Sequence, residues 1–208
     1  MKERPILMSG PMVRAILEGR KTQTRRIVKP QPSGSNTQKD PYGWRWKWVP
    51  TDKRIPICEW GKDTTGWISM LKHCPYGVHG DRLWVKETFA PHGIGDGGIA
   101  YRADGPEWDD ECDIKWKPSL FMPRWASRIT LEIEAVRVER LIEISNDDAI
   151  AEGVVYRDSC WFATDDPKAL PWMTASGAYR ELWESINGPG SWDANPWVWV
   201  IQFPRFTP

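Results

Sequence analysis

The stretch from Arg128 to Arg140 constrains the fold most, because its apolar residues change phase halfway along. They alternate with polar residues as in a strand that buries one face, slip by one position at Ala135, and then alternate again. The apolar positions are Ile129, Leu131 and Ile133 before the slip and Val136 and Val138 after it. Such a slip predicts a β-bulge or a sharp bend, and strands that turn corners in this way are typical of barrels.

Other segments predict short strands and helices in an irregular order. Ser9 and Pro11 are suited to begin a helix over 11–18, and Ser145 is placed to cap a second helix over 147–152. Further expected elements are a helix over 175–186 and strands over 83–88, 99–103 and 197–203. Because this order lacks the regular alternation of a parallel α/β sheet, we expect an α+β fold built on a mixed barrel.

The charge and cysteine content exclude several classes of protein. The chain has 28 basic and 28 acidic residues, so its formal charge is zero, which argues against binding nucleic acid through overall charge. No apolar run approaches the ~20 residues of a membrane span. The four cysteines form no CxxC pair, and a zinc site from Cys58, His73, Cys74 and His79 would lack the usual ligand spacing. We therefore expect a cytoplasmic protein with reduced thiols, no membrane partner, and no metal or cofactor.

Tryptophan is the unusual residue of the composition, with 15 against 5 Phe and 5 Tyr. Many tryptophans lie in three segments that we interpret as insertions, at about 33–76, 104–118 and 156–175, within a single domain of residues 1–208. There they would form a satellite core or a lid over a cleft, and the alternation over 44–48 predicts an exposed hairpin strand. Four others lie on or beside expected barrel strands and would pack in the core: Trp84, Trp125, Trp197 and Trp199.

A basic cluster follows the first expected helix. Its members are Arg20, Lys21, Arg25, Arg26 and Lys29. The cluster indicates a local anion site, although basic residues after a helix also complement its dipole. Lys21 and Thr24 suit nucleophilic catalysis, because a base turns a threonine hydroxyl into a nucleophile and neighbouring cations lower the pKa of a lysine; the alternative is an ordinary polar strand edge. On a flat strand these two side chains would face opposite sides, so we expect the segment to turn.

A carboxylate would complete such a site by carrying a proton or by orienting the lysine. Glu87 lies on the apolar face of the strand expected over 83–88. Glu152 lies at the end of a short helix, where its charge opposes the helix dipole and requires a compensating cation. The residues alone leave both acids open, and a surface or ion-paired acid is the alternative for each.

Several blocks of the sequence resemble one known family. The run from Gly19 to Arg26 after an apolar helix is similar to the G-x-K-x-T signature of the ASCH domain, a small β-barrel of the PUA-like superfold. Five further blocks are similar to ASCH-like proteins encoded by phages and prophages: residues 5–7 with 12–17, then 80–90, 122–129, 149–153 and 195–200. The chain is longer than a minimal member of the family, and its insertions leave the substrate open.

The resemblance implies a PUA-like mixed barrel with short flanking helices and long aromatic-rich insertions. It also implies action on, or binding of, RNA or modified nucleosides, since the family includes a bacterial N4-acetylcytidine amidohydrolase and a single-strand ribonuclease. By carry-over, Thr24 would attack an acetyl carbonyl, Lys21 would activate Thr24, and Glu152 would assist proton transfer. The candidate substrate-binding residues are Arg20, Arg25, Arg26, Trp84 and Glu87.

These observations are compatible with three functions. The first is an amidohydrolase that acts on a modified nucleoside of the N4-acetylcytidine type. The second is a non-catalytic RNA or nucleotide binder, with a ribonuclease between the two. The third is a phage structural or host-interaction protein whose exposed tryptophans contact other proteins, and a phage-encoded chain would work in the host cytoplasm.

Overall fold

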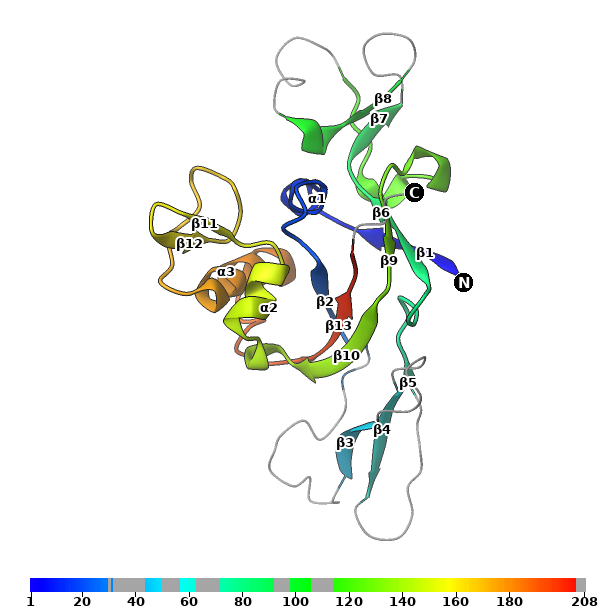
Figure 1. Ribbon diagram of the computed structural model, residues 1–208, viewed down its shortest axis with the longest axis vertical. Coiled ribbons are helices and arrows are strands. Elements are labelled where there is room, and N and C mark those ends of the chain that lie inside the picture. Colours follow the sequence, from blue (N-terminus) through cyan, green and yellow to red (C-terminus); the bar gives the residue numbers. More distant parts are fainter. Residues whose placement is uncertain are drawn as a thin grey trace.

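Two three-stranded sheets form the centre of the computed structural model (Figure 1), which has a mixed α+β fold of several small sheets and few helices. The structure describes residues 1–29, 31, 74–91, 98–105 and 114–204, together with the backbone of three more strands, β3 (Trp44–Val49), β4 (Ile57–Lys62) and β5 (Lys72–His73). The α+β class expected from the sequence is confirmed.

The first central sheet has the strand order β1-β6-β9, and the second has the order β10-β13-β2. Their bounds are β1 (Glu3–Leu7), β6 (Arg82–Lys86) and β9 (Thr130–Glu132) in the first sheet, and β10 (Ala135–Arg140), β13 (Trp197–Gln202) and β2 (Gln23–Ile27) in the second. The β1 and β6 strands run parallel, whereas the other neighbours are antiparallel. In the second sheet, Ile201 of β13 pairs with Thr24 on one side and with Val136 on the other.

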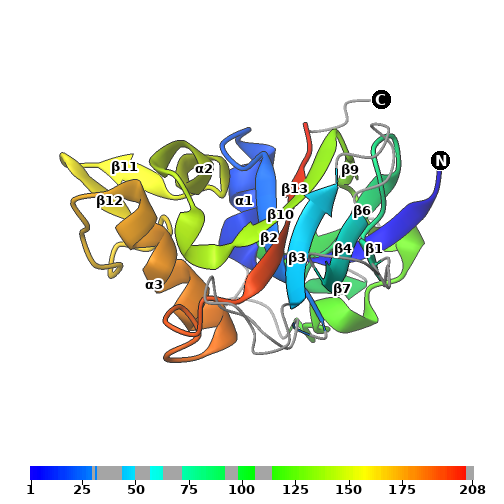
Figure 2. The same ribbon diagram turned by 90° about the horizontal axis from the view of Figure 1, so that it is seen from below.

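The change of phase at Ala135 separates β9 from β10 and carries the chain from one sheet to the other (Figures 1 and 2). Ile133 N donates a hydrogen bond to Asp81 O at 2.8 Å, next to the first sheet. Glu134 N donates to Gln202 O at 2.9 Å, in the second sheet. The bend expected at this position is therefore confirmed.

The helix α1 (Gly10–Leu17) connects β1 to β2. Each of these strands lies at an edge of its sheet, and we call them the outer strands. Pro11 lies in its first turn as expected, and Ser9 is the N-cap residue, although the Ser9 side chain makes no capping hydrogen bond. Across the space between the outer strands, Arg26 Nη2 donates to Leu7 O at 2.6 Å. The two sheets therefore approach each other at both the bent segment and the outer strands.

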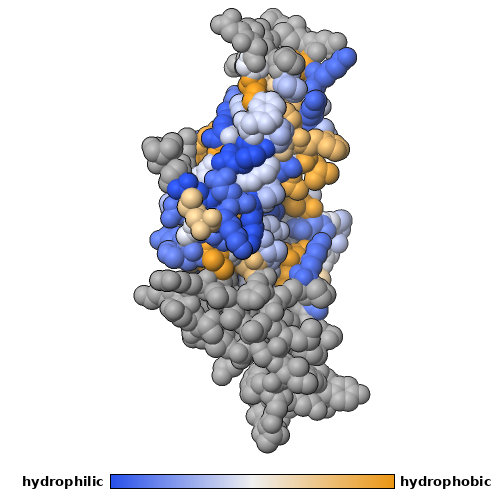
Figure 3. All heavy atoms as spheres, turned by 90° about the vertical axis from the view of Figure 1, so that its right-hand side faces the viewer, coloured by the Kyte–Doolittle hydropathy of each residue, from blue (hydrophilic) through white to orange (hydrophobic). Residues whose placement is uncertain are grey.

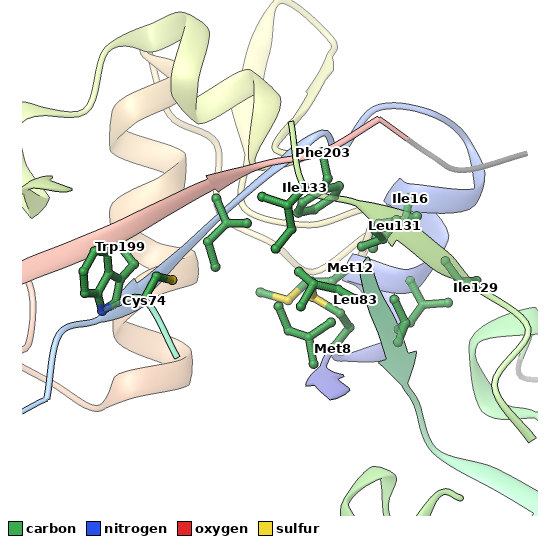
Figure 4. Close-up of a cluster of buried hydrophobic side chains, with 14 of the residues drawn as sticks. Met8, Met12, Ile16, Cys74, Leu83, Ile129, Leu131, Ile133, Trp199 and Phe203 are labelled. Atoms are coloured by element: carbon green, nitrogen blue, oxygen red, sulfur yellow. The ribbon is translucent and has the colours of Figure 1, made fainter. Parts of the chain in front are cut away.

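The main core lies between the two central sheets and α1. Figure 4 shows its side chains converging from these elements, and the fully buried members include Ile6, Ile16, Leu83, Leu131, Ile133, Ile201 and Phe203. Complete burial of an aliphatic or aromatic side chain of this size contributes about 1.5–3 kcal/mol to folding. The bent segment contributes on both sides of the slip, because Val136 and Val138 pack against the same core.

A second core lies on the other face of β13. Trp199 and Ile201 point into the main core, and the alternate residues Val198 and Val200 point into the second. There they meet the helices α2 (Asn146–Ala151) and α3 (Ala175–Asn187), which lie beside β2 and β13 in Figure 1. The apolar stripe expected on α3 is buried at Tyr179, Leu182 and Trp183, whereas Ile186 is exposed. The cap expected for α2 is present, since Ser145 Oγ accepts a hydrogen bond from Asp148 N at 3.0 Å.

Hairpins and short 3₁₀ helices surround the two cores. The hairpins are β7 (Phe89–Pro91) with β8 (Ile99–Tyr101) and β11 (Val155–Arg157) with β12 (Cys160–Phe162), and the 3₁₀ helices are η1 (Arg102–Asp104), η3 (Ser119–Phe121), η4 (Arg124–Ala126) and η5 (Leu141–Glu143). The strand expected over 99–103 ends at Tyr101 because η1 follows. The sheet of β3, β4 and β5 lies at the opposite end of the molecule from β7 and β8 (Figure 1), and β3 confirms the strand expected over 44–48.

The tryptophans divide between core and surface. Trp199 is buried in the main core, whereas Trp84 and Trp197 are half-buried. The expectation is wrong for Trp125, which is 71% exposed because η4 turns the small Ala126 inward instead. In the third insertion, Trp161 and Trp172 pack against the second core, while the tryptophans at 44, 46, 48, 60, 67 and 108 lie outside the residues whose side chains are described.

Two surface properties of the described residues complete the fold. The side of the molecule with β1, β6 and β9 carries a band of hydrophilic residues, with hydrophobic residues gathered beside it (Figure 3). Within the described part of the chain, each helix falls short of the length and apolar character needed to cross a membrane.

Candidate functional site

Lys21 is buried at the turn that follows α1. The backbone N–H groups of Arg20 and Lys21 both donate to Ala15 O, at 2.9 and 3.0 Å, and Gly19 adopts a φ of 78°, so the chain reverses before β2 begins. The Lys21 side chain is 0% exposed. Its Nζ donates to Glu152 Oε2 and to Glu152 O, both at 2.8 Å. Lys21 therefore lies in a turn and not on a flat strand, which is the condition expected for it to act together with Thr24.

Glu152 is held in place by the end of α2. It is the C-cap residue of that helix, with φ −74° and ψ −12°, and its side chain is 2% exposed. Gly153 follows with φ 98°, and a Cβ at this position would lie 3.2 Å from Lys21 Cβ. A glycine therefore satisfies both the backbone conformation and the close approach of Lys21. Of the two carboxylates left open by the sequence, Glu152 is the one that the structure brings to Lys21.

Arg25 joins Glu152 to two further carboxylates. Its Nη1 lies 3.2 Å from Glu152 Oε1, and its Nη2 contacts both Glu139 Oε1 and Asp148 Oδ2, the latter at 3.0 Å. Arg137 donates to the same two acids, at 3.0 Å to Glu139 and 2.8 Å to Asp148. Three cations, counting Lys21, thus face three carboxylates, and the network has no net formal charge.

Burial and neighbouring charges shift the proton affinities in this network. Burial lowers the pKa of Lys21 below its usual 10.5; Glu152 opposes this shift, and the positive charges of Arg26 and Arg25 reinforce it. For Arg25 the burial effect is outweighed by the negative charges of Glu152 and Glu139, so the pKa of Arg25 is raised. Arg25 is therefore a fixed cation, while Lys21 is the group displaced toward its neutral form.

Thr24 faces a pocket of about 280 Å³ beside this network, which we call the site pocket. Thr24, Arg25, Glu152 and Tyr179 are among the residues that line it, and apolar side chains of α1 and α3 supply other parts of its wall. Thr24 Oγ1 makes no hydrogen bond with any described residue and is thus available to a ligand. Lys21 does not itself line the site pocket, which it approaches through Glu152.

Tyr179 is the residue of the site that the sequence reasoning missed as a functional group. It lies on the expected buried stripe of α3 and is 3% exposed, but it also lines the site pocket, and the centre of its ring lies 5.9 Å from the Arg25 guanidinium. Its hydroxyl has no hydrogen-bond partner among the described residues. Burial raises the pKa of Tyr179 well above its usual 10, so the hydroxyl stays protonated and can donate. A phenol on an otherwise apolar helix stripe was the signal in the sequence.

The other basic candidates lie close to the network but differ in their partners. Arg20 pairs with Glu18 at 2.5 Å and donates to Gly153 O at 3.0 Å, so its charge is already matched. Arg26 lines the site pocket and donates to Leu7 O. Neither Arg26 nor Lys29, which also lines the site pocket, has a carboxylate partner among the described residues.

Trp84 and Glu87 lie away from the Lys21–Glu152 pair. Trp84 is half-buried on β6, where the Lys86 and Arg124 cations lie 5.5 and 5.9 Å from its ring. Glu87 is buried on the predicted apolar face, and both of its carboxylate oxygens accept from Arg128 at 3.0 Å. These two substrate-binding candidates are thus engaged with other partners and do not line the site pocket.

The described residues contain no group of three or more His, Cys, Asp and Glu side chains arranged to hold a metal ion. Of the zinc ligands considered from the sequence, Cys74 is buried with its pKa raised to about 11, and the side chains of Cys58 and His73 lie outside the described residues. A buried thiol with a raised pKa is a poor metal ligand and a poor nucleophile.

Comparison of the chain with known proteins found no matching family model, no matching curated protein and no matching solved structure.

Proposed function

We propose that the chain is an ASCH-type enzyme that hydrolyses an amide bond on a modified nucleoside of the N4-acetylcytidine type. The observation that carries this proposal is the buried Lys21–Glu152 pair at 2.8 Å, set beside a pocket that Thr24 and Tyr179 also line. In this proposal Thr24 is the nucleophile and Lys21, whose pKa is lowered, is the base. Glu152 carries the proton and Tyr179 donates a hydrogen bond.

The proposal includes a PUA-like mixed barrel as the scaffold. Two features support it: the bent segment that connects the two central sheets, and the hydrogen bond from Arg26 to Leu7 O between their outer strands. The hydrogen bond from Thr22 N to Ala151 O, at 2.9 Å, joins the turn after α1 to the end of α2. Lys21 and Glu152 are the chain neighbours of these two residues and contact each other at 2.8 Å. In a barrel the turn and the helix end would lie together at one opening.

In the first chemical step, neutral Lys21 draws the proton from Thr24 Oγ1, with Glu152 as the carrier at the pocket. The Thr24 oxygen bonds to the acyl carbon, and the carbonyl electron pair moves onto the acyl oxygen. Tyr179 donates a hydrogen bond to that oxyanion. The carbon–nitrogen bond then breaks, and the leaving exocyclic nitrogen takes the proton back.

In the second step, water hydrolyses the ester on Thr24. Lys21 and Glu152 accept a proton from the water while its oxygen bonds to the acyl carbon. The ester bond breaks, the proton returns to Thr24 Oγ1, and the carboxylic acid leaves. The enzyme is thereby restored, and no oxidant, reductant or cofactor enters the balance.

The size and charge of the site favour a nucleoside. About 280 Å³ lies just below the ~300–1,000 Å³ typical of ligand pockets, which suits a small ligand. Lys21, Arg25 and Arg137 each have a carboxylate partner, so no unpaired cation of this network faces the pocket, which suits an uncharged nucleobase at this end. The apolar wall from α3, including Trp183 and Ile186, suits the faces of such a ring.

The test is to incubate the protein with N4-acetylcytidine and to follow the release of cytidine and acetate. Thr24→Val, which removes the hydroxyl but keeps the β-branched shape, is expected to abolish turnover, and Thr24→Ser is expected to retain it. Lys21→Met should also be inactive, with folding checked by circular dichroism. Turnover by Thr24→Val at the wild-type rate, or no turnover by the wild type on acetylated or longer N4-acyl cytidines, would refute the proposal.

The second candidate is a nucleotide or RNA binder without hydrolysis, or a ribonuclease. Arg26 and Lys29 favour it, because they line the site pocket and have no carboxylate partner among the described residues. Binding of short single strands that weakens with salt, without release of acetate, would support the binder. Cleavage of end-labelled RNA would identify the ribonuclease.

A further inference from the structure

We propose that a second pocket, adjoining the first, binds the phosphate of a nucleotide whose base enters the site pocket. This side pocket has a volume of about 250 Å³ and is lined by residues 5–7 of β1 together with Arg26, Tyr76, Lys86 and Leu120. The proposal rests on the proposed function and deepens it, since it makes the substrate a nucleotide or a nucleotide within RNA instead of a free nucleoside.

The two pockets share a wall. Arg26 and Tyr76 line both of them, so a ligand that leaves the site pocket past these two side chains enters the side pocket directly. A base in the site pocket would carry its ribose toward this wall. Tyr76 offers an aromatic face there, and Arg26 offers a guanidinium, which are groups suited to a sugar and to its phosphate.

The cations of the side pocket differ from those of the buried network in having no acid to neutralise them. Neither Arg26 nor Lys86 has a carboxylate partner among the described residues, whereas Lys21 and Arg25 are both paired with carboxylates. The anion site that the sequence placed in the basic cluster therefore moves outward, to Arg26 and across the pocket to Lys86 on β6.

The two cations are also held in place without loss of their charge. Arg26 Nη2 donates to Leu7 O at 2.6 Å, and Lys86 Nζ donates to Leu120 O while lying 5.5 Å from the Trp84 ring. Lys86 is the register partner of Leu7 in the parallel pair of β1 and β6, so both cations flank the same residue. Two cations held beside the same residue can donate hydrogen bonds to several oxygen atoms of one phosphate.

The experiment compares N4-acetylcytidine with its 5′-monophosphate, its 3′-monophosphate and a short oligonucleotide that contains it. For the wild type we expect a KM roughly tenfold lower for a phosphorylated substrate, as charge-assisted hydrogen bonds imply, and a preference that shrinks as salt rises. Preference for a monophosphate identifies a nucleotide substrate, and preference for the oligonucleotide identifies a phosphodiester in RNA. Equal KM values for all four substrates would overturn the proposal.

Lys86→Met is the diagnostic variant, because Lys86 lies outside the proposed catalytic groups. It should raise the KM of the phosphorylated substrates to that of the free nucleoside, so that the preference for phosphate is lost. Lys86→Arg should retain the preference, and Lys168→Met, on the loop between β12 and α3, should behave as the wild type. A Lys86→Met variant that keeps the full preference would refute the role of Lys86.

A binding measurement separates failure of the subsite from failure of the proposed function. Isothermal titration with cytidine and with its two monophosphates needs no turnover. If the wild type hydrolyses nothing but binds a monophosphate about tenfold more tightly than cytidine, and Lys86→Met removes this difference, the subsite stands and the hydrolase fails. If the affinities are equal, the subsite fails whatever the activity.

Discussion

Two buried glutamates, Glu152 and Glu87, have closely similar partners in different parts of the molecule. Each side chain is 2% exposed, each pairs with an arginine, and each of these arginines contacts a second acid and lies over a tyrosine ring. Around Glu152 these partners are Arg25, Asp148 and Tyr179, and around Glu87 they are Arg128, Asp104 and Tyr101.

The two clusters differ in the hydrogen bonding of their tyrosines and in whether they border a pocket. Tyr101 Oη donates to Ala126 O at 2.9 Å, whereas the Tyr179 hydroxyl has no partner among the described residues and its ring lines the site pocket. Glu87 lines neither the site pocket nor the side pocket. Only the Glu152 cluster includes a buried lysine with a lowered pKa. A buried ion pair is thus common to both clusters, and what distinguishes the proposed site is the pocket beside it with a hydroxyl that has no partner among the described residues.

The largest expected effect is on stability, from Glu152→Gln compared with Glu87→Gln. Removal of the Glu152 charge leaves the fully buried Lys21 without a counter-ion, which costs about 3 kcal/mol in the free energy of unfolding. After Glu87→Gln, Arg128 is 25% exposed and keeps Asp104 as its partner, so we expect a loss of about 1 kcal/mol. Urea unfolding of the three proteins measures both values, and equal losses would contradict the distinction between the clusters.

The second effect is on activity, from Tyr179→Phe compared with Tyr101→Phe. Loss of an oxyanion donor lowers kcat by about 100-fold, whereas Tyr179→Phe should leave stability nearly unchanged because the hydroxyl has no partner within the described residues. Tyr101→Phe breaks the bond to Ala126 O and costs about 1 kcal/mol of stability, with kcat unchanged. If both variants keep full kcat on N4-acetylcytidine, Tyr179 has no part in the reaction.

Much of the central fold could be predicted from periodicity. The slip at Ala135 indicated the bend between β9 and β10, and the alternation of residues 83, 85 and 87 indicated their common buried face. Local patterns of this kind report which face of an element is buried, but not which element covers it. The expectation that Trp125 packs in the core fails for that reason, since the 3₁₀ helix η4 presents Ala126 inward.

The site could be predicted only in part. The basic cluster indicated Lys21 and Thr24, and the family resemblance pointed to Glu152. Residue patterns alone could not choose between Glu87 and Glu152, because the choice depends on the contact between α2 and the turn after α1. The basic cluster also suggested an anion site around Arg25, whose charge is matched by three acids that lie more than 100 positions further along the chain. Pairings over such separations leave no local pattern.

The third expected effect is the dependence of activity on pH, which follows from the lowered pKa of Lys21. In the proposed mechanism neutral Lys21 is the base, so below its pKa the reactive fraction is expected to fall about tenfold for each pH unit. We expect kcat/KM to rise with pH and to level off below 10.5, with no decline from Tyr179, because the pKa of Tyr179 is raised well above 10. Glu87→Gln should leave this profile unchanged. A flat profile, or one that falls with rising pH, would exclude Lys21 as the base.

The smallest expected effect is on stability in acid. It compares Asp148 of the Glu152 cluster with Asp104 of the Glu87 cluster. Burial raises the pKa of Asp148, but the hydrogen bond and charge of Arg137 outweigh this effect and hold it below 3.8. A carboxyl whose pKa is lowered on folding contributes stability at pH values above 3.8, and this contribution is lost as the pH falls through the folded-state pKa. Asp148→Asn should therefore cost about 1 kcal/mol at neutral pH and progressively less in acid.

Asp104→Asn is the matched control, because the Asp104 side chain is 39% exposed in its pair with Arg128 and surface pairs contribute little. Urea unfolding of the wild type and both variants, from neutral pH down through 3.8, separates the two acids. If the stability lost in Asp148→Asn stays constant as the pH falls, the loss comes from packing around α2 and not from the charge of Asp148. A deficit that shrinks in acid for Asp148→Asn alone places the stabilising charge in the Glu152 cluster.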